Sequence, residues 1–431
     1  MNLTETYLLL FVMLAIVVTA SIFLKGKHGM IAPCIYAAGL ITALVAQMGF
    51  RLREVTEGPF VFVDSTMWVL CGAVFCYLLY RNGTFQYIFN KIISVKRGSA
   101  AQMILLVLFI ALPGMLSGTA MLCVVTTGMI AGHYMLDKGV EKGAVVELVA
   151  VSSFFGMLLP PLSIPAMMTT VARAGAYPGS FEGYFVPLLV AVFPALIVYC
   201  LLSGKRLVGG LEAEEAADKS GNALCLIPLV MVLVLLLCYN FLYSVLPFIG
   251  VPPIFVVGCI LAVVCKRDSF NPLLAAADGV RYAAIELAMM LAFASATEVF
   301  TLVGVNGTIA AQLKLAGTNT ALIMFAGLAI ALLVTCLLGM PAGIVIGAPI
   351  LYVGTILGRS VIFYMLVGIV ISIGMLVSRR GSLIETVSEE LEVEKVPVAD
   401  VLKSNTAVLL VLVIMIFAML ALRTTFAGWM V

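Results

Sequence analysis

Three prolines interrupt an otherwise apolar stretch, FFGMLLPPLSIP, at residues 154–165. Because proline has no backbone N–H, Pro160 and Pro161 leave the carbonyls of Gly156 and Met157 without helical hydrogen-bond partners. In hydrocarbon each unsatisfied backbone group costs several kcal/mol, so such a break persists only where protein, water or an ion satisfies it. Freed carbonyls suit a hard cation such as Na⁺, and the N-terminus of a half-helix suits a carboxylate. The stretch therefore predicts an ion or solute site within a membrane.

The alternative interpretation of this stretch is a proline kink. Hydroxyl groups of Ser152, Ser153 and Ser163 would then satisfy the freed carbonyls, and no ligand would be needed. We favour the site because a second segment rich in small residues precedes the prolines.

That second segment is LPGMLSGTAMLCVVTTG, residues 112–128. If it is the tip of a re-entrant hairpin, Ser117, Gly118 and Thr119 offer close backbone approach and hydroxyl ligands. The other interpretation is a helix-packing face of small residues, Gly114 to Gly118, which needs no substrate. The two interpretations are compatible.

The composition is that of a polytopic membrane protein. Of 431 residues, 63% are hydrophobic and 11% are charged, and the mean hydropathy is +1.19. We expect an all-α fold with about 11 to 12 membrane elements, three of them interrupted. The apolar segments fall near 6–23, 30–50, 64–80, 101–135, 143–172, 184–203, 223–247, 251–265, 283–304, 320–358, 360–377 and 406–422.

The charge balance and the cysteine and histidine content exclude several classes of protein. A net charge of +2 provides no basic face for nucleic acid. The ten cysteines lack a CxxC pair, and the two histidines, His28 and His133, form no HExxH motif. We therefore expect no metal centre, no cofactor and no enzyme activity.

Lysines and arginines gather at four connections, which the positive-inside rule places in the cytoplasm. The first cations follow the first apolar run, so we expect residues 6–23 to be a retained helix rather than a signal peptide. One long hydrophilic stretch, residues 204–222, reads as a linker between a first half (1–203) and a second half (223–431).

The two halves share a weak internal repeat. GMLSGTA (114–120) precedes FGMLLPPLS (155–163), and GMPAGIV (339–345) precedes IGMLVSRRGS (373–382). Each half thus has an interrupted segment followed by a second interrupted helix, which is typical of secondary transporters with inverted repeats. The predicted hairpins are 101–135 and 320–358, the predicted unwound helices are 143–172 and 360–390, and the last helix is 406–422.

From about residue 66 onward, these motifs resemble the large membrane subunit of tripartite ATP-independent periplasmic (TRAP) transporters, in the ion transporter superfamily. LSGTAMLCVVTTG is similar to the family's Ser-Gly-Ser-Ser hairpin tip, and GMLLPPLSIP to its Ile-Pro-Pro-Ser unwound helix. LLGMPAGIVIGAPIL, residues 337–351, is similar to the second hairpin.

The resemblance implies an elevator-type symporter in the bacterial inner membrane. It would import organic acids, such as dicarboxylates or sugar acids, with Na⁺ as the coupling ion held by backbone near Gly118 and Gly156. A small four-helix membrane subunit and a periplasmic solute-binding protein would be its partners. The residues carried over are Ser117, Gly118, Thr119, Gly156, Pro160, Pro161, Gly339, Gly343 and Pro349. We expect Ser153 and Gly374 to belong to the same site.

The chain departs from the family at Ser378-Arg379-Arg380, where the family has Thr-Pro-Pro. One interpretation is that a guanidinium replaces a cation or binds the substrate carboxylate in a bidentate manner. The other is that the membrane helix ends at Val377, and that the arginines, with Glu385, Glu389 and Glu390, form a solvated amphipathic segment.

Glu298 lies near the middle of the apolar segment predicted over 283–304. An ionisable group there is costly and is a functional candidate, so Glu298 could couple transport to H⁺ instead of Na⁺. The alternative is a structural role, with a hydrogen bond to Thr297 or Thr301 or a pair with an arginine. We expect Glu147 and Glu286, which lie nearer predicted helix ends, to be interfacial.

Two functions remain. The first is a secondary active transporter that imports a small anionic organic solute with an ion gradient. The second is a degenerate, non-transporting membrane subunit of the same fold that serves as a scaffold for partners. An intramembrane enzyme is remote, because no apolar segment holds a paired acid and base.

Overall fold

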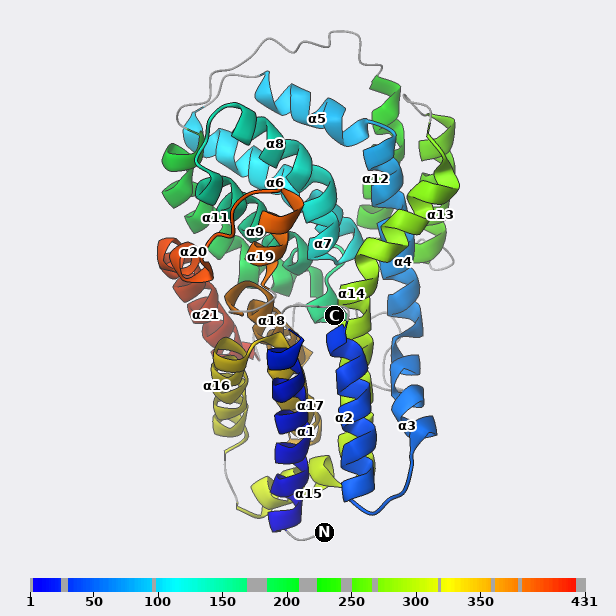
Figure 1. Ribbon diagram of the computed structural model, residues 1–431, viewed down its shortest axis with the longest axis vertical. Helices are drawn as coiled ribbons and strands as arrows, with labels where there is room; N and C mark the ends of the chain where they lie inside the picture. The colour runs from blue at the N-terminus through cyan, green and yellow to red at the C-terminus, as the bar shows by residue number, and fades with distance from the viewer. Residues whose placement is uncertain are drawn as a thin grey trace.

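The computed structural model describes residues 3–24, 30–94, 98–168, 184–208, 223–241, 250–265, 270–316, 319–357, 361–378 and 382–423. Within these ranges the regular structure is helical, without a β-strand (Figure 1). Seven helices are long and apolar enough to cross a membrane, or eight if one bent pair forms a single span. Five shorter apolar helices accompany them. The described part of the chain is thus the expected all-α polytopic membrane protein.

The helices of the first half are α1 (Leu3–Phe23), α2 (Ile31–Val45), α3 (Leu52–Glu57), η2 (Gly58–Phe62), α4 (Val63–Arg81), α5 (Thr84–Ile93), α6 (Ser99–Ser117), α7 (Ala120–Cys123), η3 (Val124–Gly128), α8 (Met129–Asp137), α9 (Lys142–Leu158), α10 (Ile164–Met167) and α11 (Phe185–Val208). Because α11 extends to Val208, the predicted linker 204–222 begins with helix. Residues 209–222 lie outside the described residues.

The helices of the second half are η6 (Ala223–Leu226), α12 (Ile227–Phe241), α13 (Val251–Val264), α14 (Pro272–Leu302), α15 (Val305–Leu315), α16 (Thr320–Leu338), α17 (Met340–Leu357), α18 (Val361–Val377), α19 (Leu383–Glu390), α20 (Val398–Ser404) and α21 (Thr406–Ala421). We call α6 with α7, η3 and α8 the first hairpin, and α16 with α17 the second hairpin.

The two hairpins belong to matched series of helices. Helices α6 and α16 each have 19 residues, Ala120–Asp137 and α17 each have 18, and α9 and α18 each have 17. Gly83 and Gly304, both with positive φ, precede the short helices α5 and α15 and lie 221 positions apart. Figure 1 shows α5 near the upper end of the molecule and α15 near the lower end. Equal lengths with opposite placement indicate two structural repeats of opposite orientation.

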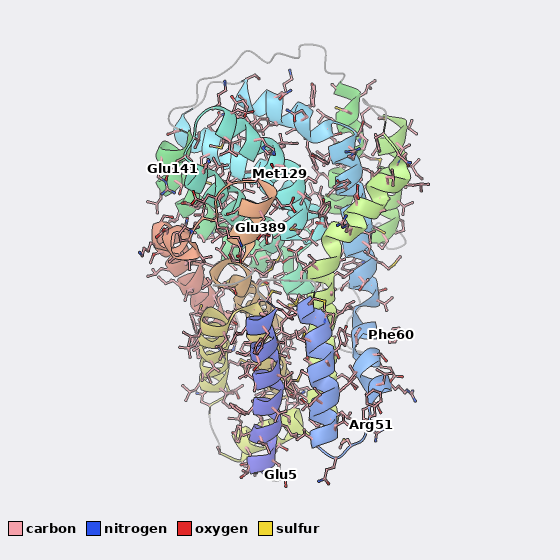
Figure 2. All side chains as sticks on the ribbon, viewed as in Figure 1. Glu5, Arg51, Phe60, Met129, Glu141 and Glu389 are labelled. Carbon is pink, nitrogen blue, oxygen red and sulfur yellow. The ribbon has the colours of Figure 1, made fainter. Side chains whose placement is uncertain are left out.

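Charged side chains mark both ends of the long axis. In Figure 2, Glu5 and Arg51 lie toward the lower end, and Glu141 lies in the upper part. At the lower end Arg51 pairs with Glu54 at 2.9 Å and Arg53 pairs with Glu57 at 2.6 Å. These pairs are largely exposed and contribute little to stability.

Helix α14 is the longest helix in the described part of the chain, and it organises one group of helices. It packs against α2, α3, η2 and α4, while α13 packs on α4 and α12. A second group comprises the two hairpins with α9, α10, α11, α18 and α21. The groups meet where α14 contacts α7 and α17 and where α4 contacts α6.

An ion pair between a buried glutamate and a half-exposed arginine joins helices of the second group. Glu147 of α9 accepts hydrogen bonds from Arg206 of α11 at 2.5 Å and from the Ser404 hydroxyl of α20 at 2.9 Å. Its side chain is 4% exposed. The expectation that Glu147 is interfacial stays a prediction, and the structure adds that its partners come from segments far away in the sequence.

Helix α10, which follows the proline stretch, crosses α18 at Gly368. A Cβ placed on Gly368 would overlap the carbonyl oxygen of Pro165 in α10. Only glycine allows the two backbones to approach this closely.

We expect Gly368→Ala to lower the free energy of unfolding by about 1–3 kcal/mol, because the added methyl group must push α10 and α18 apart. Thermal unfolding of the purified protein in detergent measures the effect. Gly307→Ala is the matched control, since a Cβ at Gly307 in α15 meets nothing within 4 Å. Equal melting temperatures for the two variants would show that the crossing is not tight.

Candidate functional site

The turn of the first hairpin is built by Ser117, Gly118 and Thr119. Gly118 adopts a left-handed conformation, with φ of 78°, between α6 and α7. The Ser117 hydroxyl donates to the carbonyl of Pro113 at 2.7 Å and lies 2.8 Å from the Thr119 hydroxyl. All three turn residues are buried. The tip therefore satisfies its own hydroxyl groups before any ligand binds.

The proline break lies directly against this tip. Helix α9 ends at Leu158, Pro160 and Pro161 are joined by a cis peptide bond, and α10 begins at Ile164. The Leu162 N–H donates to the carbonyl of Met115 in α6 at 3.0 Å. Gly118 and Ser163 form an isolated parallel β-bridge. The interrupted backbone is thus satisfied in part by the hairpin, which neither the kink nor the ion interpretation anticipated.

Two glycines permit this contact. A Cβ on Gly114 would lie 2.7 Å from the carbonyl carbon of Gly156, and one on Gly156 would lie 2.7 Å from the Ala111 oxygen. The hydroxyls of Ser153 and Ser163 beside the break are buried and have no hydrogen-bond partner among the described residues. The close packing of small residues is therefore confirmed, and ligand binding at this tip stays a prediction.

The second hairpin repeats the arrangement with different residues. Gly339, with φ of 87°, joins α16 to α17, and a Cβ there would lie 2.9 Å from the Ser378 Oγ. A Cβ on Gly374 of α18 would lie 2.6 Å from the Met340 nitrogen, and Gly343 packs against Thr335. The second tip therefore lies against the end of α18, as the first tip lies against the end of α9.

Pro349 does not belong to this tip. It lies within α17, away from Gly339, and lines a separate apolar cavity of about 360 Å³ between α15, α16, α17 and Phe363. The sequence placed it at the site because the resemblance covered the whole segment 337–351. In the structure Gly339 and the N-terminus of α17 form the tip, whereas Pro349 lies in the middle of that helix.

The charged segment after α18 forms a helix of its own. Helix α19 is N-capped by Ser382, whose Oγ accepts from the Glu385 N–H at 3.2 Å. Glu385 and Glu389 pair with the exposed Lys395 at 2.7 and 3.2 Å, and Figure 2 shows Glu389 on α19 in the upper part of the molecule. These two glutamates follow the solvated interpretation. Arg379 and Arg380 lie outside the described residues.

A cavity of about 310 Å³ opens at the second tip. Its walls come from α1, α2, α14, α16, α17 and α18. Most of them are apolar. The lining includes Ser21, Glu286, Leu338, Gly339, Met340 and Ser378.

Glu286 connects this cavity to the first hairpin. Its Oε1 accepts hydrogen bonds from the N–H groups of Ala120 at 2.9 Å and Met121 at 3.1 Å. Its side chain is 3% exposed, and Oε2 has no hydrogen-bond partner among the described residues. Glu286 therefore contacts the first tip through its carboxyl group and is one of the residues that line the cavity at the second.

The sequence predicted Glu286 to be interfacial, and that expectation is wrong. The predicted crossing began at residue 283, whereas α14 begins at Pro272, so Glu286 lies near the middle of the helix. Asp278 and Arg281 had concealed this earlier start. The signal that reveals it is Asn271, whose side chain accepts from the N–H groups of Leu273 and Leu274 ahead of a proline at N1.

Glu298 lies apart from the other predicted site residues. The true bounds of α14 place it one turn from the C-terminal end of the helix, and its side chain is exposed. The sequence suggested Glu298 rather than Glu286 as the functional carboxyl group. Burial and position in α14 favour Glu286 instead.

Two hairpins whose tips lie against the ends of α9 and α18 define a class of polytopic membrane protein with a transporter fold. The model is similar to the crystal structure of the YdaH transporter of Alcanivorax borkumensis, with a TM-score of 0.61, 13% sequence identity, and coverage of 88% of this chain and 89% of that one. This similarity confirms the expected fold. No protein-family model and no curated protein sequence matches the chain.

We expect Gly339→Ala to destabilise the protein by about 1–3 kcal/mol, because its backbone conformation is nearly restricted to glycine and the methyl group would crowd Ser378. Gly49→Ala is the control, since Gly49 also has positive φ but a Cβ there meets nothing within 4 Å. The measurement is the melting temperature of each purified variant. If Gly49→Ala proved as destabilising as Gly339→Ala, close packing of the second tip would be refuted.

Proposed function

We propose that this protein is a secondary active transporter that imports a small anionic organic solute with an ion gradient. The observation that carries the proposal is the 310 Å³ cavity, which is enclosed by the second tip, α14 and the end of α18. Each hairpin tip lies against the end of a membrane helix, where polar backbone groups are available at depth. Such sites are where inverted-repeat transporters bind their cargo.

The walls of the cavity suit a small organic acid. Helix α17, of 18 residues, begins at Met340 on the cavity wall, and the positive end of a helix dipole favours a carboxylate. The apolar side chains around it suit a carbon skeleton. The volume is at the lower end of the range for small-molecule sites. We therefore place the solute carboxylate near Gly339 and its carbon atoms against the apolar side chains of the cavity wall.

Transport requires that the site face each side of the membrane in turn. The group of helices around α14 meets the group around the hairpins at places where small residues lie between them. One such residue is Gly72 of α4, where a Cβ would overlap the Leu116 oxygen beside the first tip. A glycine contact of this kind lets one backbone slide along another. We propose an elevator motion in which the hairpin group moves along α4 and α14.

The coupling ion and the partners are proposed from the resemblance and from the buried hydroxyls. Ser153 and Ser163 beside the proline break, with the backbone near Gly118 and Gly156, form the proposed Na⁺ site. A small four-helix membrane subunit and a periplasmic solute-binding protein would complete a transporter in the bacterial inner membrane. Genes for both next to this one would support that assembly.

We expect Leu338→Trp to lower gradient-driven uptake about tenfold or more, because an indole at the cavity wall takes the place of solute and a loss of 1.4 kcal/mol is already tenfold. Leu338 is 43% exposed, so the fold can accommodate the larger ring. Uptake of radiolabelled succinate and gluconate into proteoliposomes, under imposed Na⁺ or H⁺ gradients and with and without periplasmic extract, is the measurement.

Leu333→Trp is the matched control for this substitution. Leu333 lies on the same helix and is 61% exposed, but it does not line the cavity, so its uptake should equal that of the wild type. Undiminished uptake by Leu338→Trp would place the solute elsewhere. Absence of gradient-driven uptake in the wild type would favour the non-transporting scaffold.

A further inference from the structure

Glu286 carries two oxygens in different surroundings. Oε1 accepts two N–H groups at the start of α7, and this bond joins α14 to the first hairpin. Oε2 is buried, lacks a hydrogen-bond partner among the described residues, and belongs to a residue that lines the 310 Å³ cavity. A neutral carboxyl group fits this asymmetry, with Oε1 as the carbonyl oxygen and Oε2 as the hydroxyl.

The described surroundings of Glu286 contain no cation. The titratable groups that face it are two thiols, the buried Cys123 beside the first tip and Cys336 on the cavity wall. Lys25, Lys27 and His28, between α1 and α2, and Arg379 and Arg380, after Ser378, lie outside the described residues. A buried carboxylate is costly unless a charge or a proton neutralises it.

We infer that Glu286 is the proton-binding site that couples H⁺ to the anionic solute, a role that rests on the proposed function. The neutral carboxyl donates its Oε2 hydroxyl to a carboxylate of the solute in the cavity. The ionised form repels the same carboxylate and offers it no donor. Proton and solute therefore enter together, and Oε1 contacts the first hairpin in the conformation that the structure describes.

Na⁺ is a poorer match for this position than a proton. A hard cation needs several oxygen ligands, as Ca²⁺ and Mg²⁺ sites illustrate. Among the described lining residues, only Ser21 and Ser378 add side-chain oxygens, and the Ser21 hydroxyl already donates to the Val17 carbonyl at 2.8 Å. A proton needs no further ligand. The Na⁺ site proposed at the first tip is separate from Glu286.

The test compares Glu286→Gln with Glu298→Gln, two isosteric changes on the same helix. Glutamine keeps an oxygen for the Ala120 and Met121 N–H groups and keeps a donor toward the cavity, so the protein should fold and still exchange labelled succinate or gluconate across the membrane. Uptake driven by an imposed pH gradient should disappear in Glu286→Gln. It should stay at the wild-type level in Glu298→Gln, whose side chain is exposed.

The pH dependence of solute binding provides a second readout. Because only neutral Glu286 binds the solute, wild-type affinity should be full at low pH and should fall about tenfold per pH unit once the carboxyl ionises. Affinity in Glu286→Gln should not follow pH. Persistent pH-driven accumulation by Glu286→Gln overturns the inference.

Infrared difference spectroscopy examines the carboxyl group without any solute. The wild type and Glu298→Gln should show a protonated-carboxyl band that disappears as pH rises, and Glu286→Gln should lack it. An unchanged band in Glu286→Gln overturns the inference. Wild-type uptake that follows Na⁺ alone also overturns it but leaves the proposed function intact. Absence of uptake with a normal band overturns the proposed function and the coupling role together, and leaves Glu286 as a protonated carboxyl group only.

Discussion

The structure depends on how it satisfies backbone groups where a membrane helix is broken. Hydrocarbon provides no partner for a free carbonyl or N–H, so a break must find one within the protein or in a ligand. Here the break after α9 donates from Leu162 to Met115 and pairs Ser163 with Gly118 of the facing hairpin. The tip and the break therefore stabilise each other. The close glycine contacts follow from the same need, because only backbones in contact can exchange hydrogen bonds.

Much of this arrangement could be predicted from the sequence because its signals are local. Prolines remove helical hydrogen bonds wherever they stand, and Gly118 supplies the conformation that a tight turn needs. The membrane elements likewise follow from apolar runs longer than a bilayer is thick. What failed was the start of α14, where Asp278 and Arg281 resemble a loop although the helix continues through them. Because the predicted start was three turns too late, Glu286 was placed near a helix end and Glu298 near the middle of the helix. The structure shows the reverse.

Contacts between distant segments could not be predicted. Glu147 is buried because Arg206 and Ser404, from two other helices, close over it. Glu385 turns toward Lys395 rather than toward the second tip. Neither pairing has a local pattern, since side-chain contacts across the bundle depend on how helices cross. For the same reason, a resemblance over 337–351 could not distinguish the tip at Gly339 from Pro349 farther along the helix.

The two repeats differ at the position that we propose for proton coupling. Gly118 and Gly339 are 221 positions apart, as are Gly83 and Gly304. The same spacing makes Ser65 of α4 the equivalent, in the first repeat, of Glu286 of α14 in the second. Ser65 is buried but neutral over the whole physiological pH range. A repeat fold offers two similar tips, so symmetric carboxylates would place two charges in one apolar region. A single carboxyl group gives the pair of tips one protonation event, which is what the proposed entry of a proton together with the solute requires.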